Sequence, residues 1–262
     1  TATTEIYTLS LHDAPPISVT LEDLTDQVIA FLRAYTVHVT HPRYFGLFNP
    51  SVRRPGLVAD LLAALYNPQL AAWSHAPAAN EIERHTLRFF CRLLGWDPDA
   101  AIMNFTSGGM EANFSGLLAA LAFHFPESGA EGLRGIPGKP LVFLTAESHH
   151  SFLKAARMAG LGTGCLREVP TTAGFTMDTG RLETMIREER KRGTRPFLVV
   201  GTAGTTGGGL IDPLAEIADI AARYGLWFHA DAAWGGSALL SSRLRPLLAG
   251  IELADSDRKS VV

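Results

Sequence analysis

The chain has 262 residues, of which 47% are hydrophobic and 19% are charged, and its formal net charge is −3 at pH 7. This composition is typical of a globular protein with one large domain, and it excludes an intrinsically disordered chain. The small negative charge gives no reason to expect nucleic acid or an anionic membrane as a partner.

The content of cysteine and the distribution of apolar residues narrow the class further. Two cysteines, Cys91 and Cys165, cannot build a disulfide framework, which favours a reduced, cytoplasmic protein. The sequence contains no run of about 18 or more apolar residues, so no membrane span is predicted. A basic region followed by an apolar core is missing at the N-terminus, so no signal peptide is predicted.

The two ends differ in character from the rest of the chain. Residues 1–17 have no helical period and join poorly to the helical pattern that begins at residue 19, and residues 257–262 interrupt the pattern of the preceding segment. We expect both ends to be non-native or disordered and to lie outside the fold.

An N-terminal helical segment is predicted over residues 18–95. Apolar residues recur at helical spacing over 19–36, 55–66 and 79–95, and Gly95 is a typical signal for the end of a helix. The aromatic stretch 41–50, punctuated by Pro and Gly, is equally consistent with a binding loop and with an anchored surface loop.

Strands and helices alternate after residue 96. Apolar runs predict strands over 141–146, 197–203 and 226–230, and the intervening patterns predict helices over 109–124, 152–159, 181–192 and 213–224. The repeated order of strand, polar loop and helix predicts an α/β domain, a mostly parallel sheet covered by helices on both faces.

Asp231 ends the last of these strands, and small residues and glycines follow it through Gly236. A carboxylate at the buried end of a strand is costly unless it faces a cation. Ligands of open α/β sheets lie outside the carboxyl ends of the strands, and the protonated ring nitrogen of pyridoxal phosphate is a suitable cation. Two interpretations stay open from this segment alone: a partner for that nitrogen, or an Asp that caps the next turn.

Other candidate residues precede helices or follow strands. Ser107, Gly108, Gly109 and Met110 lead into a helix, where free N–H groups favour a phosphate, although such a turn is often only a cap. His149 follows a strand and either lies flat on an aromatic ring or bonds within its loop. Because His149 and His150 are adjacent, they would face different ways, and no metal site is predicted.

The combination of these features favours a phosphorylated, protonated heteroaromatic ring over the common nucleotides. A dinucleotide would require Gly-x-Gly-x-x-Gly directly after the first strand, and a nucleoside triphosphate would require Gly-Lys-Ser/Thr. Neither pattern is present. A glycine turn, His149, the hydroxyl loop at Thr205 and Thr206, and Asp231 together suit pyridoxal phosphate.

Several longer motifs carry a family resemblance from about His41 to Ser256. They are, in chain order, HPRYFGLFNP, AANEIERHTLRFFCRLLG, FTSGGMEAN, SHHSFLKAA, GTAGTTGGGLIDPLAEIADIA, LWFHADAAWGGSALL and GIELADS. The chain resembles the group II pyridoxal-phosphate decarboxylases, the family of aromatic-amino-acid and glutamate decarboxylases. The resemblance implies the fold-type I, aminotransferase-like large domain over residues 96–256, with a seven-stranded, mostly parallel sheet. It also implies a homodimer that acts on a small-molecule amino acid.

The resemblance implies a role for each candidate residue. Gly109 and Met110 would give backbone donors to the cofactor phosphate, and Ser107 and Gly108 would shape that loop. His149 would stack on the ring, Thr206 would lie beside it, Asp231 would pair with its nitrogen and Ala233 would pack against it. The segment that would line the substrate pocket comprises Leu47, Phe48 and Asn49. The reaction implied is decarboxylation of an L-amino acid to the amine and CO₂.

The chain departs from the family at its Schiff-base lysine. That lysine lies about seven residues past the serine of the Ala-Asp-Ser motif, in an Asn/Asp-x-His-Lys segment. Lys259 lies three positions past Ser256 and lacks the preceding His, so it is not assigned this role. We therefore expect a truncated and inactive family member. The alternatives are an aminotransferase or lyase of the same fold, and a non-catalytic fragment.

Overall fold

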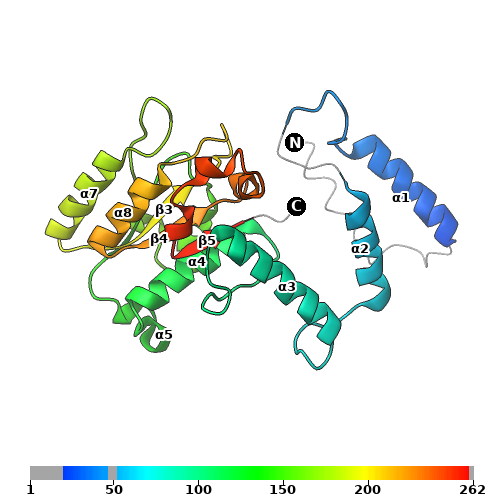
Figure 1. Ribbon diagram of the computed structural model, residues 1–262, viewed down its shortest axis with the longest axis horizontal. Helices are drawn as coiled ribbons and strands as arrows, with labels where there is room; N and C mark the ends of the chain where they lie inside the picture. Colours follow the sequence, from blue (N-terminus) through cyan, green and yellow to red (C-terminus); the bar gives the residue numbers. More distant parts are fainter. Residues whose placement is uncertain (1–19, 47–51, 260–262) are drawn as a thin grey trace, which may run out of the picture. The chain divides into compact units, whose positions relative to one another are not determined.

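The computed structural model describes residues 20–46 and 52–259, and the chain divides into two compact units, residues 1–62 and 63–262. Figure 1 labels helices α1 (Leu21–Tyr35) and α2 (Arg54–Tyr66). Helix α1 belongs to the first unit, and the division falls within α2. Thr20 caps α1, because its hydroxyl accepts a hydrogen bond from the Asp23 amide at 3.1 Å. Neither helix contains a buried residue.

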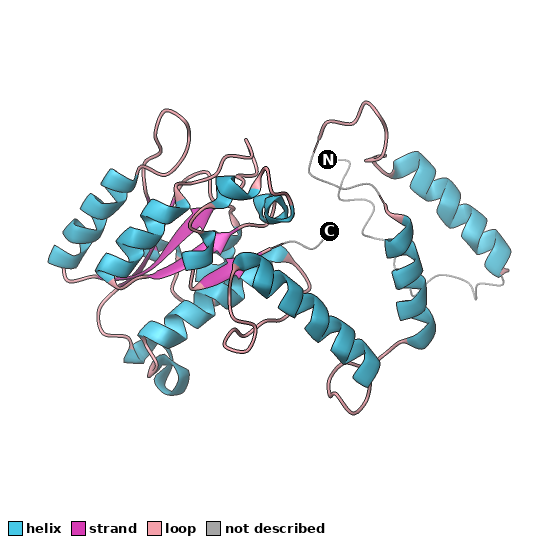
Figure 2. Cartoon of the chain, in the orientation of Figure 1, coloured by secondary structure: helices cyan, strands magenta, loops and turns pink. Residues whose placement is uncertain are grey.

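The second unit is built around one parallel sheet. The strands of this sheet are magenta in Figure 2. They follow the order β2-β1-β3-β4-β5, and every neighbouring pair is parallel. The strand bounds are β1 Pro140–Leu144, β2 Leu166–Glu168, β3 Arg195–Thr202, β4 Trp227–Asp231 and β5 Ser256–Arg258. The central strand β3 is buried over Pro196–Thr202, as expected of a strand covered on both faces.

Helices cover the sheet on both faces and define two apolar clusters. Alternate residues of β3 divide between them, Val199 joining one cluster and Leu198 and Val200 the other, because successive side chains of a strand point to opposite faces. The first cluster packs under α7 (Thr179–Lys191) and α8 (Leu214–Tyr224). The second packs under α4 (Gly109–His124) and α6 (Ser151–Met158).

The remaining helical elements are shorter or peripheral. They are α3 (Pro77–Leu94), α5 (Ser128–Glu131), and the 3-10 turns η2 (Gly132–Gly135), η3 (Thr163–Cys165), η4 (Gly235–Leu240), η5 (Arg245–Leu248) and η6 (Ile251–Leu253). Gly95 and Gly225 end α3 and α8 with left-handed backbone, at φ of 86° and 54°, where a glycine costs least.

Three features differ from the sequence expectations. Helix α3 belongs to the second unit and not with the N-terminal helices, because Leu94 at its end joins the core of the sheet domain. The described residues form a five-stranded sheet where the resemblance implied seven strands. Asp257 and Arg258, which we expected to lie outside the fold, lie in β5 and pair with Ala230 and Asp231. Backbone pairing to an existing sheet edge, which tolerates charged side chains, explains this last difference.

Over the described ranges, the helices are too short or too polar to cross a membrane. The same part of the chain contains no group of three or more His, Cys, Asp or Glu residues that could hold a metal ion.

Candidate functional site

Asp231 is the last residue of β4 and lies at the carboxyl edge of the sheet, with only 3% of its surface exposed. One carboxylate oxygen, Oδ2, accepts a hydrogen bond from Asn113 Nδ2 at 2.9 Å. The other, Oδ1, accepts from the Ala233 amide at 3.3 Å. This carboxylate is therefore buried and held by donors, while Oδ1 keeps capacity for a further partner.

That further partner is the guanidinium of Arg258. Its Nη1 lies 3.1 Å from Asp231 Oδ1, and both side chains are largely buried. The same guanidinium lies against Gly109, where any added Cβ would overlap it. Asp231 and the glycine turn therefore border one space, and that space accepts a planar cation beside the carboxylate.

The glycine turn stands at the start of α4. Gly108 is the N-cap residue and has no side chain to accept from the first-turn amides, which leaves them to an external acceptor. Ser107 donates instead to Glu111, through its amide at 2.7 Å and through its hydroxyl at 2.6 Å. These bonds lower the pKa of the Glu111 carboxyl and fix the turn that precedes Gly109 and Met110.

His149 follows β1 and is half-buried. Its Nδ1 accepts a hydrogen bond from the Ser151 amide at 3.2 Å, which orients the ring. Burial lowers the pKa of the His149 imidazole, its neighbour His150 adds to this effect, and the Asp231 carboxylate opposes it. His149 thus lies within electrostatic reach of Asp231 and is held as a neutral ring at pH 7.

The loop after β3 separates the two threonines that the sequence grouped together. Thr205 is buried, and its hydroxyl accepts from the Leu210 amide at 3.1 Å, which gives it a role in the loop itself. Thr206 is exposed, and Ala233 is half-buried beside Asp231. The substrate-pocket residues Leu47, Phe48 and Asn49 fall outside the described residues.

A buried polar cluster behind Asp231 was missed by the sequence analysis. Asn113 also donates to Ser151 Oγ at 2.9 Å, and its Oδ1 lies 3.2 Å from His229 Nε2. His229 Nδ1 in turn lies 2.7 Å from Ser256 Oγ. The only sequence signals were that Asn113 and Ser256 fall inside the motifs GGMEAN and LADS, and that His229 alternates with apolar neighbours on its strand.

The Lys259 amine is bound by groups other than Asp231. Its Nζ donates to the Gly236 carbonyl at 2.7 Å and lies 4.9 Å from the centre of the Phe90 ring. Burial lowers the pKa of this amine, whereas the Asp257 carboxylate opposes that shift.

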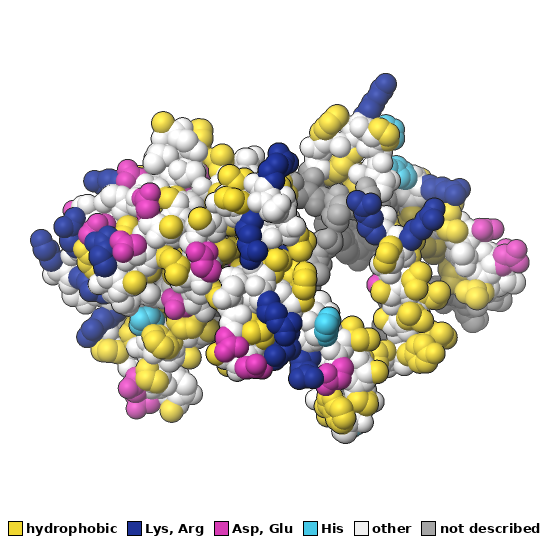
Figure 3. All heavy atoms as spheres, viewed as in Figure 1, with side chains coloured by type: hydrophobic (Ala, Val, Ile, Leu, Met, Phe, Trp, Pro, Cys, Tyr) yellow, Lys and Arg dark blue, Asp and Glu magenta, His cyan; other side chains and the backbone are white. Residues whose placement is uncertain are grey.

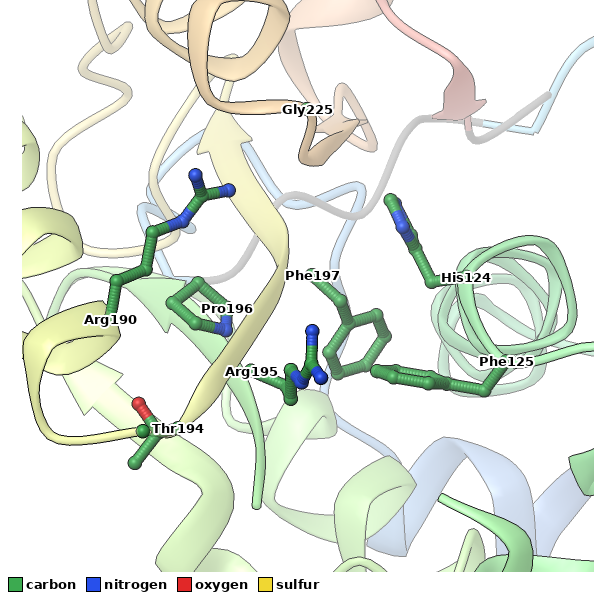
Figure 4. Close-up of a pocket in the computed structure, with 9 residues that line it drawn as sticks. His124, Phe125, Arg190, Thr194, Arg195, Pro196, Phe197 and Gly225 are labelled. Atoms are coloured by element: carbon green, nitrogen blue, oxygen red, sulfur yellow. The ribbon is translucent and has the colours of Figure 1, made fainter. Parts of the chain in front are cut away.

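A separate hollow of about 520 Å³ lies at the opposite, amino edge of the sheet. Figure 4 shows its lining, which includes Arg190, Thr194 and Arg195 around the start of β3 and Gly225 before β4. It contains none of the residues that the sequence analysis singled out as a site.

Comparison with known proteins identifies the family of the chain. The model of the pyridoxal-dependent decarboxylase conserved domain matches residues 6–259. The chain belongs to this family. It is 38% identical over 222 residues to the acidic amino acid decarboxylase GADL1 of Bos taurus, covering 85% of this chain and 42% of that protein. The chain therefore spans less than half the length of this relative.

Solved structures of the family share the fold. Mouse CSAD in apo form superposes with a TM-score of 0.89 at 33% identity, over 95% of this chain and 52% of that chain. Oryza sativa TDC with PLP gives a TM-score of 0.82 at 29% identity, over 96% and 55%. Membership confirms the α/β, fold-type I prediction and the resemblance on which it was based.

The residues present fit the family's cofactor, pyridoxal phosphate. The buried carboxylate of Asp231 pairs with a cation, the Arg258 guanidinium, and a protonated ring nitrogen would need a partner of the same kind. A glycine turn with an uncapped helix start borders the same space, as a phosphate requires.

Proposed function

We propose that this chain binds pyridoxal phosphate at the carboxyl edge of the sheet, with Asp231 Oδ1 as partner of the ring nitrogen. The observation that carries the proposal is the burial of Asp231 together with its pairing to a cation beside Gly109. We assign Ser107, Gly108, Gly109 and Met110 to the phosphate, and His149, Thr206 and Ala233 to the ring. We assign Leu47, Phe48 and Asn49 to the substrate.

The proposed reaction is decarboxylation of an L-amino acid to the amine and CO₂. When bound, pyridoxal phosphate supplies an electron-withdrawing ring that takes up the electron pair left at Cα. Asp231 keeps a proton on the ring nitrogen because a buried carboxylate stabilises the charged form of its partner. His149, neutral at pH 7, offers a flat face to the ring without adding a second positive charge.

The substrate class that we propose is an acidic amino acid. Support comes from the name of the 38% identical relatives, acidic amino acid decarboxylase. We also propose that the chain does not attach the cofactor covalently, because the Lys259 amine is engaged by the Gly236 carbonyl. On this proposal the described residues supply binding and electrostatics, and by themselves give no turnover.

We further propose a cytoplasmic homodimer. Helices α1 and α2 expose apolar side chains, among them Leu21, Phe31, Leu61 and Leu65 at 63% or more, and the apolar surface of α2 is yellow in Figure 3. Exposed apolar faces of this kind mark sites of protein–protein contact. Both cysteines are free and buried, as expected of a protein from a reducing compartment. Light scattering tests the dimer, and a monomeric chain would contradict it.

Cofactor binding is tested with Asp231→Ala, measured by equilibrium dialysis of pyridoxal phosphate. We expect affinity to fall at least about 30-fold, because a charge-assisted hydrogen bond is lost. Asp219→Ala, which removes an exposed carboxylate of α8, is the matched control and should bind normally. Equal affinity of Asp231→Ala and the unmodified chain would contradict the proposal.

The substrate class is tested without any need for turnover. Phosphopyridoxyl amino acids, in which the substrate amine is joined to the cofactor by a stable single bond, occupy both parts of the site. We expect the adduct of glutamate or aspartate to bind more tightly than that of leucine. The reverse order would overturn the acidic assignment and leave the cofactor site intact. Because we propose that the described residues give no turnover by themselves, the reaction is tested by product analysis on a complete homologue, in which amine and CO₂ support decarboxylation and a keto acid contradicts it.

A further inference from the structure

The polar groups behind Asp231, which are buried or half-buried, form one continuous chain of hydrogen bonds. It runs from Trp227 Nε1 to Ser256 Oγ at 2.8 Å, from there to His229 Nδ1 at 2.7 Å, and from His229 Nε2 to Asn113 Oδ1 at 3.2 Å. The last bond joins Asn113 Nδ2 to Asp231 Oδ2 at 2.9 Å. These side chains come from α4, β4 and β5, which the sheet and its covering helix bring together.

The direction of every bond in this chain is fixed from its two ends. A carboxylate only accepts, so the Asn113 amide must present Nδ2 to Asp231 and Oδ1 to His229. His229 must then carry its proton on Nε2. Burial lowers the pKa of His229 to about 4, so at pH 7 its Nδ1 is unprotonated and accepts from Ser256. The indole of Trp227 only donates, and it completes the chain at Ser256.

The chain depends on close contact between α4 and β4. Gly116 lies one helical turn after Asn113, and a Cβ at this position would lie 2.7 Å from both Cε1 and Nδ1 of His229. Glycine at 116 therefore lets the imidazole lie against the helix and reach the amide of Asn113.

We propose that Asn113 is a positioning residue for the cofactor site, held in one orientation by His229, Ser256 and Trp227. It binds Oδ2 of Asp231 and so leaves Oδ1 directed at the cation, which in the cofactor is the ring nitrogen. This inference rests on the proposed function. Because Asn113 and His229 are both buried, an unpartnered amide or imidazole would be costly, and this cost fixes the arrangement.

The test compares pyridoxal phosphate with its deaza analogue, in which a ring CH replaces the nitrogen. Both ligands must displace Arg258 equally, so this cost cancels in the ratio of their affinities. We expect the unmodified chain to prefer pyridoxal phosphate by about tenfold or more. Asn113→Ala should lose this preference while binding the analogue as before. Asn80→Ala, on α3, removes a helical asparagine outside the cluster and should keep the preference.

The outcomes separate the inference from the proposed function. Equal binding of the two ligands by the unmodified chain would overturn the role of Asp231 itself. A preference that survives in Asn113→Ala would overturn only the positioning role. Should Asn113→Ala fail to fold, Ser256→Ala and Ser256→Thr decide the question. Ser256→Ala should lose the preference for pyridoxal phosphate, and nitrogen NMR spectra should show loss of the Nε2–H form of His229. Ser256→Thr, which keeps the hydroxyl, should retain both the preference and this form.

Discussion

The two edges of the sheet use charged groups in opposite ways. At the amino edge, the hollow of about 520 Å³ is lined by polar side chains that donate to the backbone of the fold: Arg190 donates to the Tyr224 carbonyl, and the Thr194 hydroxyl donates to the Glu189 carbonyl near the end of α7. At the carboxyl edge, donors from three elements converge on one carboxylate, which in turn holds a cation. The candidate site is therefore recognised by donors that converge on one buried carboxylate, and not by the size of a hollow.

The largest effect that we predict concerns Asp257 and the way in which the stability of the chain depends on pH. Burial raises the pKa of the Asp257 carboxyl in β5 from 3.8 to about 7. The folded chain therefore binds this proton more tightly than the unfolded chain, and stability is lost as pH rises from about 4 through 7. Asp257→Asn should stabilise the protein by roughly 2 kcal/mol at pH 8 and leave it unchanged near pH 4.

Urea unfolding of Asp257→Asn and the unmodified chain at both pH values measures this difference. Comparing the two proteins at each pH removes the opposite contribution of His229, whose lowered pKa costs stability as pH falls from 6.5 toward 4. Asp219→Asn, on the exposed surface of α8, should show no such trend. An equal shift in both variants would mean that the carboxyl edge is no more sensitive to charge than the surface.

The next effect concerns Arg258, the cation that pairs with Asp231. Because its guanidinium takes the space between Asp231 and Gly109, the cofactor must displace it. Arg258→Ala should raise the affinity for pyridoxal phosphate by about tenfold, since one charge-assisted contact is no longer broken on binding. Arg195→Ala, at the amino edge, should change nothing. If Arg258→Ala instead weakened binding, the guanidinium would be a phosphate ligand and not a competitor.

A smaller effect is expected at the contact between α4 and β4. Gly116→Ala places a Cβ 2.7 Å from the His229 ring and should destabilise the fold by about 1 kcal/mol through overpacking. Gly129→Ala in α5 meets nothing within 4 Å and should be neutral or slightly stabilising. Thermal unfolding of the two variants compares them directly. A neutral Gly116→Ala would show that α4 and His229 do not need this approach.

At Lys259 we expect substitution to have no effect on the bound cofactor. With its amine bound to the Gly236 carbonyl, Lys259→Ala should leave the absorption spectrum of added pyridoxal phosphate unaltered. Borohydride treatment followed by peptide mass analysis checks the same point, because it would trap any cofactor attached to this lysine. An adduct at Lys259 would contradict our assignment.

Local signals were enough to predict most of the elements, and the family resemblance predicted the fold and its class. The Gly-Gly step gave the start of α4 at Gly109, and Gly95 and Gly225 gave the ends of two helices. These signals work because they depend on backbone geometry within a few residues. The family, the fold class and the cofactor are confirmed, whereas the roles of the individual site residues stay predictions.

The contacts around Asp231 could not be predicted from local sequence signals. Asn113 and Asp231 lie 118 positions apart, and a helical asparagine carries no sign of its distant partner. We expected residues 257–262 to be non-native and to lie outside the fold, because they interrupt the pattern of the preceding segment. Backbone pairing with β4 and the buried charge of Asp231 give two of these residues their place, and neither is visible in local sequence.

The position of β5 at the sheet margin has a consequence for how the molecule would come apart. Three residue pairs join it to β4, and it carries both Ser256 and Arg258. Edge elements with few contacts open at lower free energy than the centre of a domain. Fraying of this margin would release the imidazole of His229 from its support while the helices stay intact. Amide exchange at residues 256–258 should thus report loss of cofactor affinity well before circular dichroism detects any melting.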